Sequence, residues 1–454
     1  MKALVLLVAA LCGALPNRWI GPALPLIWVL ERLLTPQLEV AITLGPVGVT
    51  PTDILLAVLT AKLLVALVLR KELVLDSPLY IALAAYVAVN FVATVAAGLK
   101  FGPAAFFPSL TSLARFTFET LLIVIVAQSV QTVARAKRFL LCLLGTLALL
   151  AFIQFVNAFG VSHGITIGEV QGLERGEARY FGPIGDSIGI VLLLGYLFAL
   201  CAASLTGAAL FLGGILLTGG LGATVATGVA TFLFLVFGLR TAVVRDLAQR
   251  RLWLLPVLVL VVGAAVVFLA SSLGGTLLDR VTTGAYMESA EQRGASSKLA
   301  ARMILDNPLL GVGYMGFERA LPKYGGDAYF DLQHPDGGTA NANNQILQAL
   351  TDSGVFGLIA FGALMICAGR LFLRVSARSE DRFITIYYLA VFLWLLTQVF
   401  GNLGAVWFIP ASYSTRLLWV STGVAVALAR LMPAAQPATA PRGRAPTEPQ
   451  LQPA

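Results

Sequence analysis

The sequence predicts an all-α, polytopic transmembrane bundle of about 12 helical spans, with one large and partly helical external loop. Hydrophobic residues make up 58% of the chain and charged residues only 12%, and the mean hydropathy is +0.87. A soluble domain carries roughly twice that share of charged residues. Apolar runs of about 20 residues, long enough to cross a bilayer, recur along the whole chain. A water-soluble globular protein is therefore excluded.

Most of the predicted spans are separated by short loops. The first is interrupted by prolines and is compatible with one span or with two shorter ones. The stretch 206–238 fits a hairpin around Gly219 and Gly220 or one long helix. The expected spans are 3–30, 52–69, 79–97, 110–130, 138–158, 184–204, 206–218, 221–238, 252–271, 345–369, 383–402 and 413–432.

These spans divide the chain into four parts. Residues 1–271 form the N-terminal transmembrane helices, 272–344 the large loop, and 345–432 the C-terminal transmembrane helices. The remaining tail, 433–454, is rich in Pro and Ala and has little to bury, so we expect it to be disordered. A loop as long as 272–344 is more than two helices need for their connection, and such loops usually carry function.

The basic residues predict the orientation of the chain. They cluster in short loops near 70–71, 135–138, 240–251 and 370–382, and alternation of the spans places all four clusters on one side. Short loops that are rich in Lys and Arg lie mostly on the cytoplasmic side of the membrane. The large loop is then periplasmic and the C-terminal tail cytoplasmic. The net charge of +8 is thus explained by orientation and does not indicate nucleic-acid binding.

The large loop contains a predicted amphipathic helix at Ser296–Asn307. Its apolar face holds Leu299, Ala300, Met303 and Ile304, and its polar face Lys298, Arg302 and Asp306. Pro308 should end this helix, and Gly311 and Gly313 permit a tight turn directly after it. If the loop has no chemistry, the helix is a lid on the membrane surface.

Few other residues are candidates for chemistry. The four cysteines lie in or at the ends of apolar spans, so neither a disulfide framework nor a Cys-based metal site is predicted. Two histidines, His163 and His334, cannot form a metal cluster unaided. Arg115 and Glu119 are four residues apart in one span and are expected to pair within the membrane.

Three segments follow one another on the predicted external side. The first is Arg179–Gly182 ahead of a span, the second runs from Arg293 through RMILDNPLLGVG, and the third is NQILQ with GVFG after it. Together with the span number and the position of the loop, they resemble the bacterial O-antigen ligase and O-antigen polymerase family. The resemblance covers most of the chain.

This resemblance implies an integral-membrane glycosyltransferase with a fold similar to the GT-C type. Such enzymes move a glycan from a polyprenyl (undecaprenyl) pyrophosphate carrier to an acceptor hydroxyl at the outer face of the bacterial inner membrane. The implied partners are the lipid-linked glycan donor, a glycan or lipid-glycan acceptor and membrane lipids, in polysaccharide or lipopolysaccharide biosynthesis of the cell envelope. The family resemblance implies no cofactor, and the external loops contain no Asp-x-Asp metal motif. Whether the chain is a ligase or a polymerase depends on the acceptor, which these residues do not identify.

The matched positions supply the candidate site. Arg179 and Arg293 share the external side and could clamp one diphosphate, because guanidinium groups bind phosphate with two donors and stay charged. For Arg179 the alternative is an interfacial residue that reaches to the headgroups. The expected substrate-binding residues are Arg302, Asn344, Gly311, Gly313 and Arg416.

The chain departs from the family pattern where a histidine is expected, because Asn343 stands there. An amide cannot remove a proton. Either Asn343 only orients the acceptor hydroxyl, or another group such as His334, Asp336 or Glu291 takes the proton. A flippase or transporter for a lipid-linked glycan is the alternative function, but such proteins usually show internal repeats, and none is convincing here.

Overall fold

The computed structural model describes the chain in several stretches. These are residues 8, 10–12, 14, 42–44, 47–49, 51–70, 77–164, 167, 169–171, 179–182, 188–218, 221–238, 240–241, 244, 246, 285–325, 341–401, 406–410 and 412–432.

Helices make up most of this structure. The helices of the predicted spans are α3 (Pro51–Arg70), α4 (Pro78–Phe101), α5 (Pro103–Ser129), α6 (Val133–Gly160), α7 (Ile188–Cys201), α8 (Leu205–Leu217), α9 (Leu221–Leu233), α16 (Gln345–Arg378), α17 (Arg382–Leu396) and α18 (Tyr413–Leu431). The π-helical segments η5 (Phe234–Gly238) and η7 (Thr397–Gly401) continue α9 and α17, and η2 (Val161–His163) follows α6. The large loop contributes α13 (Ala285–Asp306), α14 (Phe317–Ala320) and η6 (Leu321–Tyr324). Side-chain oxygens of Ser77, Thr132 and Ser204 cap the first turns of α4, α6 and α8.

Two short hairpins add strands to the helical fold that the sequence predicts. Strands β1 (Ile42–Leu44) and β2 (Val47–Val49) pair antiparallel, with Thr43 opposite Gly48. Strands β3 (Glu169–Gln171) and β4 (Arg179–Gly182) also pair antiparallel, with an irregular register next to Glu169. The motif that begins at Arg179 therefore lies in the strand segment that precedes α7.

Within the described residues, five helices are long and apolar enough to cross a membrane. They are Pro78–Phe101, Pro103–Ser129, Val133–Gly160, Gln345–Arg378 and Arg382–Phe400. The stretch 206–238 contains two helices, α8 and α9, rather than one. The predicted spans 3–30 and 252–271 and the tail 433–454 lie wholly or mostly outside the described residues, so the number of about 12 spans stays a prediction. The chain is a helical membrane protein.

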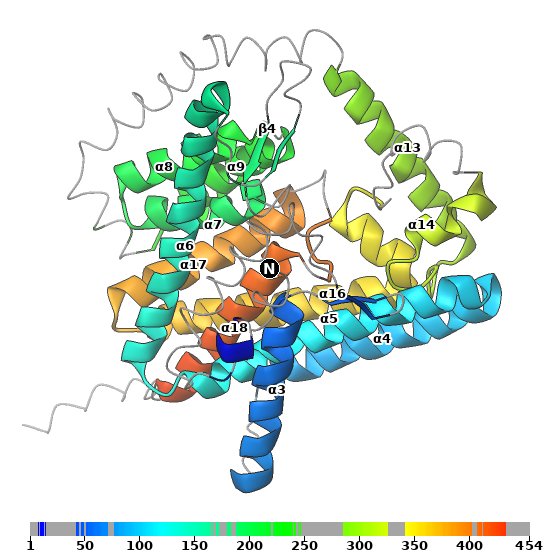
Figure 1. The fold of residues 1–454 in the computed structure, drawn as a ribbon, viewed down its shortest axis with the longest axis horizontal. Helices are drawn as coiled ribbons and strands as arrows, with labels where there is room; N and C mark the ends of the chain where they lie inside the picture. The colour runs from blue at the N-terminus through cyan, green and yellow to red at the C-terminus, as the bar shows by residue number, and fades with distance from the viewer. Residues whose placement is uncertain are drawn as a thin grey trace, which may run out of the picture.

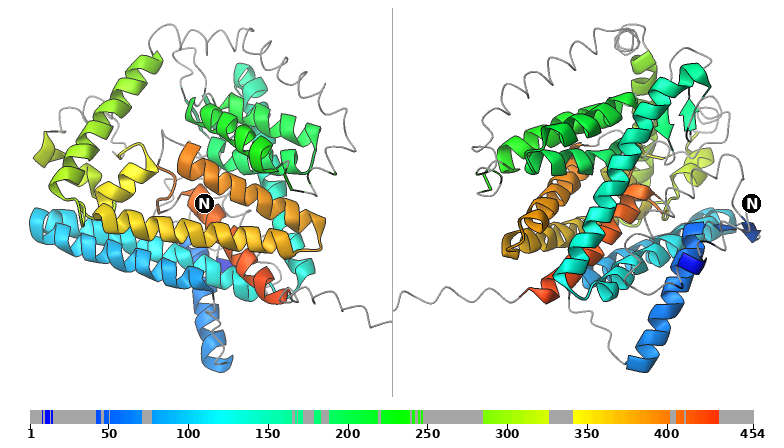
Figure 2. Two further views of the ribbon diagram at one scale, coloured as in Figure 1. Left: turned by 180° about the vertical axis from the view of Figure 1, so that it is seen from behind. Right: turned by 60° about the vertical axis from the view of Figure 1, so that its left-hand side comes forward.

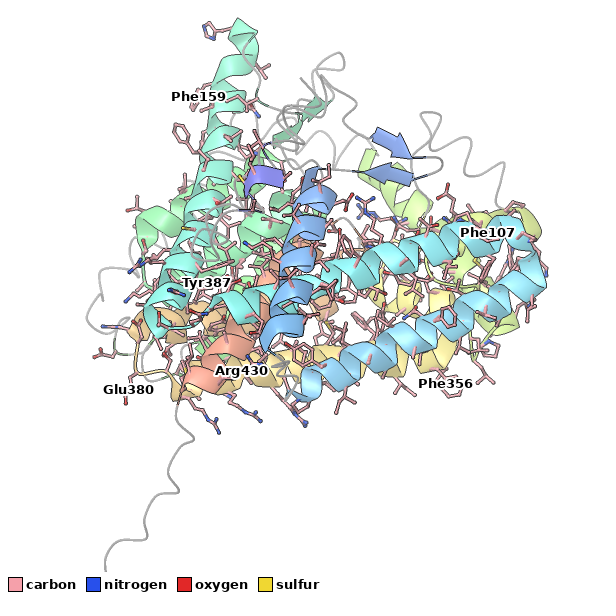
Figure 3. The ribbon with its side chains drawn as sticks, turned by 60° about the horizontal axis from the view of Figure 1, so that its bottom comes forward. Phe107, Phe159, Phe356, Glu380, Tyr387 and Arg430 are labelled. Carbon is pink, nitrogen blue, oxygen red and sulfur yellow. The ribbon has the colours of Figure 1, made fainter. Side chains whose placement is uncertain are left out.

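The helices form two packed groups. The α4–α5 hairpin lies along α16, and α18 packs against α5 (Figure 1). Helices α7, α8 and α17 form the second group, which α17 joins to α16 (Figure 2). Phe107 lies at one end of the first group, and Glu380 and Arg430 lie toward the other (Figure 3). Side chains such as Phe107 and Phe356, 63% and 49% exposed, suit a lipid surface at the outside of this bundle.

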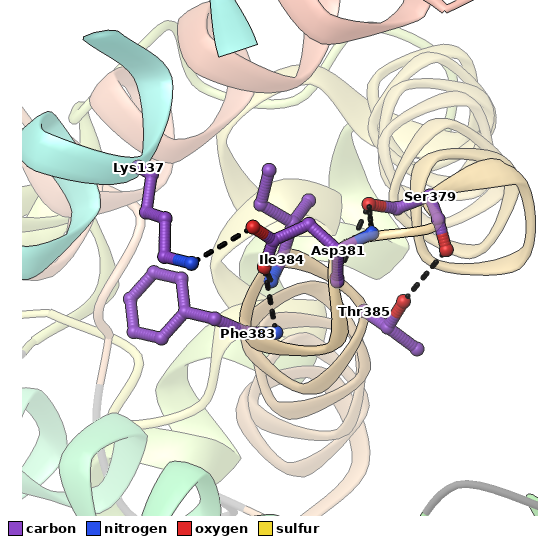
Figure 4. Close-up of polar contacts among 6 residues, drawn as sticks. All are labelled: Lys137, Ser379, Asp381, Phe383, Ile384 and Thr385. Atoms are coloured by element: carbon purple, nitrogen blue, oxygen red, sulfur yellow. Dashed lines mark hydrogen bonds and ion pairs between the residues drawn. The ribbon is translucent and has the colours of Figure 1, made fainter. Parts of the chain in front are cut away.

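Two ion pairs gather three of the basic clusters at one end of the bundle. Lys137 Nζ lies 2.8 Å from Asp381 Oδ2, and Arg382 Nη2 lies 3.7 Å from Asp246 Oδ2. Asp381 also caps α17 by accepting from the backbone N–H groups of Phe383 and Ile384 (Figure 4). Burial raises the pKa of Asp381, but the bonds from Lys137 and from these amides outweigh it, and the net pKa is lowered.

The predicted pairing of Arg115 with Glu119 is wrong. Arg115 Nη2 instead lies 3.0 Å from Asp53 Oδ2 of α3, and Arg416 of α18 binds Glu119. The Arg416 Nε and Nη2 atoms donate to the same Glu119 oxygen at 3.2 and 3.1 Å, and both side chains are 1% exposed. Because α3 and α18 each offer a partner at this depth, contacts between helices replace the pair expected within one helix.

Candidate functional site

The centre of the candidate site is a break in α16, onto which the large loop docks. Ser353 and Gly354 leave the helical conformation, with φ of −138° and +62°. The loop that follows α13 satisfies the exposed backbone groups: Val312 N donates to Thr351 O at 2.8 Å and Gly313 N to Asp352 O at 2.9 Å. In return Val355 N donates to Pro308 O at 2.9 Å. The broken helix and the loop thus complete each other's hydrogen bonding.

Glycines make this close contact possible from both sides. Gly311 has φ +64°, and a Cβ there would lie 2.3 Å from Thr351 O. Gly354 faces the loop in the same way, because its Cβ would lie 2.3 Å from the Leu309 carbonyl carbon. Gly313, at φ +95°, packs against Ala97 of α4. The predicted tight turn at Gly311 and Gly313 is confirmed.

Asp352 of α16 contacts the next part of the loop, around Met315. Its buried carboxylate accepts a hydrogen bond from Gln348 Nε2 at 2.8 Å, and the backbone N–H groups of Met315 and Gly316 face it. Met315 has a φ of +52°, which is unusual for a residue with a side chain. Successive N–H groups that turn toward one carboxylate form a small anion-binding nest. The carboxylate therefore fixes the loop conformation.

Gln348 links Asp352 to the turn that contains Asn343. Its Oε1 accepts from Ala342 N at 2.9 Å, while its Nε2 holds Asp352. Asn343 has a φ of +53°, and its backbone N donates to Asn341 Oδ1 at 2.8 Å. Asn344 caps α16 by accepting from Ile346 N and Leu347 N. Among the three asparagines of this turn, only the Asn343 side-chain amide makes no hydrogen bond within the described part of the chain.

The polar motif of α16 also holds the segment ahead of α18. Gln345 Oε1 accepts from Trp407 N at 3.1 Å and from Phe408 N at 2.9 Å. Trp407 O in turn accepts from Ser414 and Thr415 at the start of α18. All three polar residues of the sequence motif NQILQ therefore have a structural role, which leaves the side chain of Asn343, directly before the motif, available to a substrate.

Helix α13 packs against this turn through its C-terminal half and carries Arg293 further toward its N-terminus. The predicted amphipathic helix is confirmed and begins earlier than expected, at Ala285. Its residues Leu299, Ala300 and Met303 are buried in a small cluster that includes Ala342. Arg293 lies seven residues before Ala300, about 10 Å further along the same face, and is partly buried. In the described residues its guanidinium has neither an ion pair nor a hydrogen bond.

The other predicted residues take different positions. Arg302 is exposed on α13, Asn344 is a helix cap, and Arg416 is engaged with Glu119 below the site. Arg179 lies in β4, but its side chain lies outside the described residues, as do His334, Asp336 and the side chain of Glu291. No group of three His, Cys, Asp or Glu residues gathers in the described segments, and the metal-independence of the chain stays a prediction.

Three further basic residues lie at the same end and belong to no sequence motif. Arg319 Nη1 donates to Ser109 Oγ at 3.1 Å and to Met315 O at 2.9 Å, and burial lowers its pKa. Lys100 donates to Asn307, and Lys323 lies 4.8 Å from the centre of the Phe101 ring. These cations line the junction between the α4–α5 turn and the loop. Each of the three has a partner more than about 200 residues away in sequence, so no local pattern identifies them.

The family comparison agrees with this geometry. No curated protein matches the chain. A family model described as O-antigen ligase matches residues 206–362, from α8 through α13 and the Asn343 turn into α16. The matched segment includes Arg293, the loop glycines and the broken helix, whereas Arg179 and Arg416 lie outside it. The resemblance of the chain to the O-antigen ligase and polymerase family is thereby confirmed over residues 206–362.

Proposed function

We propose that the chain transfers a glycan from a polyprenyl pyrophosphate carrier to an acceptor hydroxyl at the outer face of the bacterial inner membrane. The observation that carries this proposal is the pairing state of the polar groups on α13 and on the first turns of α16. Arg293 and Asn343 are unengaged within the described residues, whereas the neighbouring Gln345, Gln348 and Asp352 are all hydrogen-bonded. Groups left available beside an ordered scaffold are suited to bind substrate.

In the proposed reaction, the acceptor oxygen attacks the anomeric carbon of the first sugar. The bond between this carbon and the diphosphate oxygen breaks, and polyprenyl pyrophosphate leaves with the electron pair. The acceptor proton passes to a base or to water. Arg293, together with Arg179, stabilises the charge that develops on the diphosphate, because a guanidinium offers two parallel donors. Asn343 orients the acceptor hydroxyl through its side-chain amide.

The test is a transfer assay with purified full-length protein, a polyprenyl-pyrophosphate glycan and an acceptor glycan. Release of free polyprenyl pyrophosphate together with a lengthened acceptor supports the proposal. Arg293→Ala should abolish release, and Arg293→Lys should restore it poorly because an ammonium lacks the fork. Lys298→Ala is the matched control, since Lys298 lies on the same helix. Turnover that survives in Arg293→Ala would refute the diphosphate clamp, and movement of intact donor across vesicles without release would indicate a flippase.

The orientation is part of the same proposal. The ion pairs of Lys137 and Arg382 gather basic clusters at the end opposite the Asn343 turn, and the positive-inside rule makes that end cytoplasmic. In a variant without native cysteines, a cysteine at Gly325 should react with an impermeant thiol reagent from the periplasm. A cysteine at Glu380 should not. The reverse pattern would place the proposed site on the wrong side of the membrane.

A further inference from the structure

The two non-glycine residues of the candidate site with positive φ, Met315 and Asn343, lie next to the two ends of one buried hydrogen-bonded path. The path joins the Asp352 carboxylate, which Met315 N faces, to the Gln348 amide and on to Ala342 N, next to Asn343. A positive φ is strained for Met315 and better tolerated by Asn343, and such conformations persist where the surroundings hold them. In the described residues only one other non-glycine residue, at the α7–α8 turn, has a positive φ.

We propose that Asp352 and Gln348 are positioning residues that hold the Asn343 amide toward the acceptor. The proposal rests on the function proposed above. Both side chains are nearly inaccessible, at 4% and 2% exposure, so they act on the substrate only through the backbone that they bind. In the described part of the chain neither side chain has a hydrogen bond to Asn343 itself, and their influence passes through Ala342 N.

Each hydrogen bond of this path has a fixed donor and acceptor, so replacing one side-chain oxygen by nitrogen, or the reverse, disrupts it. The Asp352 carboxylate is used only as an acceptor, and Gln348 donates to it and accepts from Ala342 N. In Asp352→Asn, one orientation of the new amide turns its NH₂ toward the backbone N–H groups of the loop. The other orientation turns it toward the Gln348 NH₂. Rotating Gln348 by a half-turn moves the same conflict to Ala342 N, so one donor always faces another.

The variant Gln348→Glu creates the opposite conflict, because two carboxylates then face each other. In the double variant Gln348→Glu/Asp352→Asn, every bond has a donor and an acceptor again. The NH₂ group of the introduced asparagine donates to the introduced glutamate, and the asparagine oxygen accepts from the loop. The other glutamate oxygen accepts from Ala342 N. The side chains keep their shape while the charge moves by one turn of α16.

The test measures kcat, the KM for the lipid-linked donor and thermal stability in the full-length protein. Asp352→Asn and Gln348→Glu should each lower kcat about tenfold with an unchanged donor KM, since misplaced groups affect turnover strongly. The double variant should recover to within about threefold of wild type. Ser376→Ala is the matched control: it removes a buried hydrogen bond to Thr385 O at the other end of α16, so it should lower stability and leave kcat unchanged.

Coupling to Asn343 separates positioning from general stabilisation. If Asp352 acts through Asn343, then Asp352→Asn should lower kcat no further in an Asn343→Ala background. If Asp352→Asn lowers kcat by the same factor in the Asn343→Ala background as in the wild type, the inference is wrong. Should Asp352→Asn not fold, the double variant carries the test, and a folded double variant without turnover refutes the proposal. If instead Arg293→Ala and Asn343→Ala both keep wild-type transfer, the proposed function itself fails, whatever the result at Asp352.

Discussion

The buried pair of Arg416 and Glu119 predicts a large difference between removing one partner and removing both. Both side chains are 1% exposed, and two donors of Arg416 lie 3.1 and 3.2 Å from one Glu119 oxygen. Glu119→Leu leaves a buried guanidinium without its counter-charge, and loss of one partner from such a pair costs about 3–5 kcal/mol. The double variant Glu119→Leu/Arg416→Met replaces both charges by apolar groups of similar volume and should be close to neutral.

Unfolding in mixed detergent micelles, followed by tryptophan fluorescence, measures these free energies. A loss below about 1 kcal/mol in Glu119→Leu would refute the assignment of a desolvated pair. The same proteins test whether Arg416 binds phosphate, as the sequence suggested. Because Glu119 already neutralises Arg416, the double variant should keep its rate of glycan transfer. A folded double variant that has lost transfer would show that Arg416 contributes to substrate binding.

Other expectations follow from the loop, the α17 cap and the composition of the external side. Gly354→Ala should lower the unfolding free energy by more than about 2 kcal/mol and reduce transfer, because of its positive φ and the adjacent loop backbone. Gly362→Ala, in open space on the same helix, should change stability by less than about 1 kcal/mol. Equal losses of stability in the two variants would contradict the close packing of the loop against Gly354. Asp381→Asn keeps the cap but loses the pairing with Lys137, which should cost about 0.2–1 kcal/mol at neutral pH. Because the pKa of Asp381 is lowered in the folded state, this contribution is complete above the unfolded pKa of about 4 and disappears as the pH falls through the folded pKa. A stability difference between wild type and Asp381→Asn that grows in acid would contradict this assignment. Transfer should continue in EDTA, and loss of activity that one divalent ion restores would reveal a metal site.

The sequence predicts the parts of this fold that depend on neighbouring residues. The amphipathic helix before Pro308 and the turn at Gly311 and Gly313 follow from periodicity and from backbone freedom, and the structure confirms both. The helical content of the spans is predictable for the same reason. Span number and membrane orientation stay predictions.

Partners across the bundle are not accessible to the same reasoning. Glu119 and Arg416 are 297 positions apart, and several helices could offer either side chain a partner. The expected pairing with Arg115 failed because a neighbouring residue on one helix competes with residues of other helices at the same depth. Gln348 and Asp352 were missed although they had a local signal: they stand four residues apart in an apolar span, just before Gly354. Polar side chains at that spacing within a membrane helix indicate a backbone that needs partners.

The order of the chain has a consequence for how the loop at the α16 break is made. Residues 308–316 are synthesised before Thr351 and Asp352, whose carbonyls later accept from Val312 and Gly313. Helix α4 is already present at that stage, and its Thr94 can accept from Tyr314 N at 3.2 Å. Helix α4 is thus the first template for the loop, and insertion of the first turns of α16 closes it. Assembly of the site is a late event in biogenesis, completed by a helix that enters the membrane after most of the bundle.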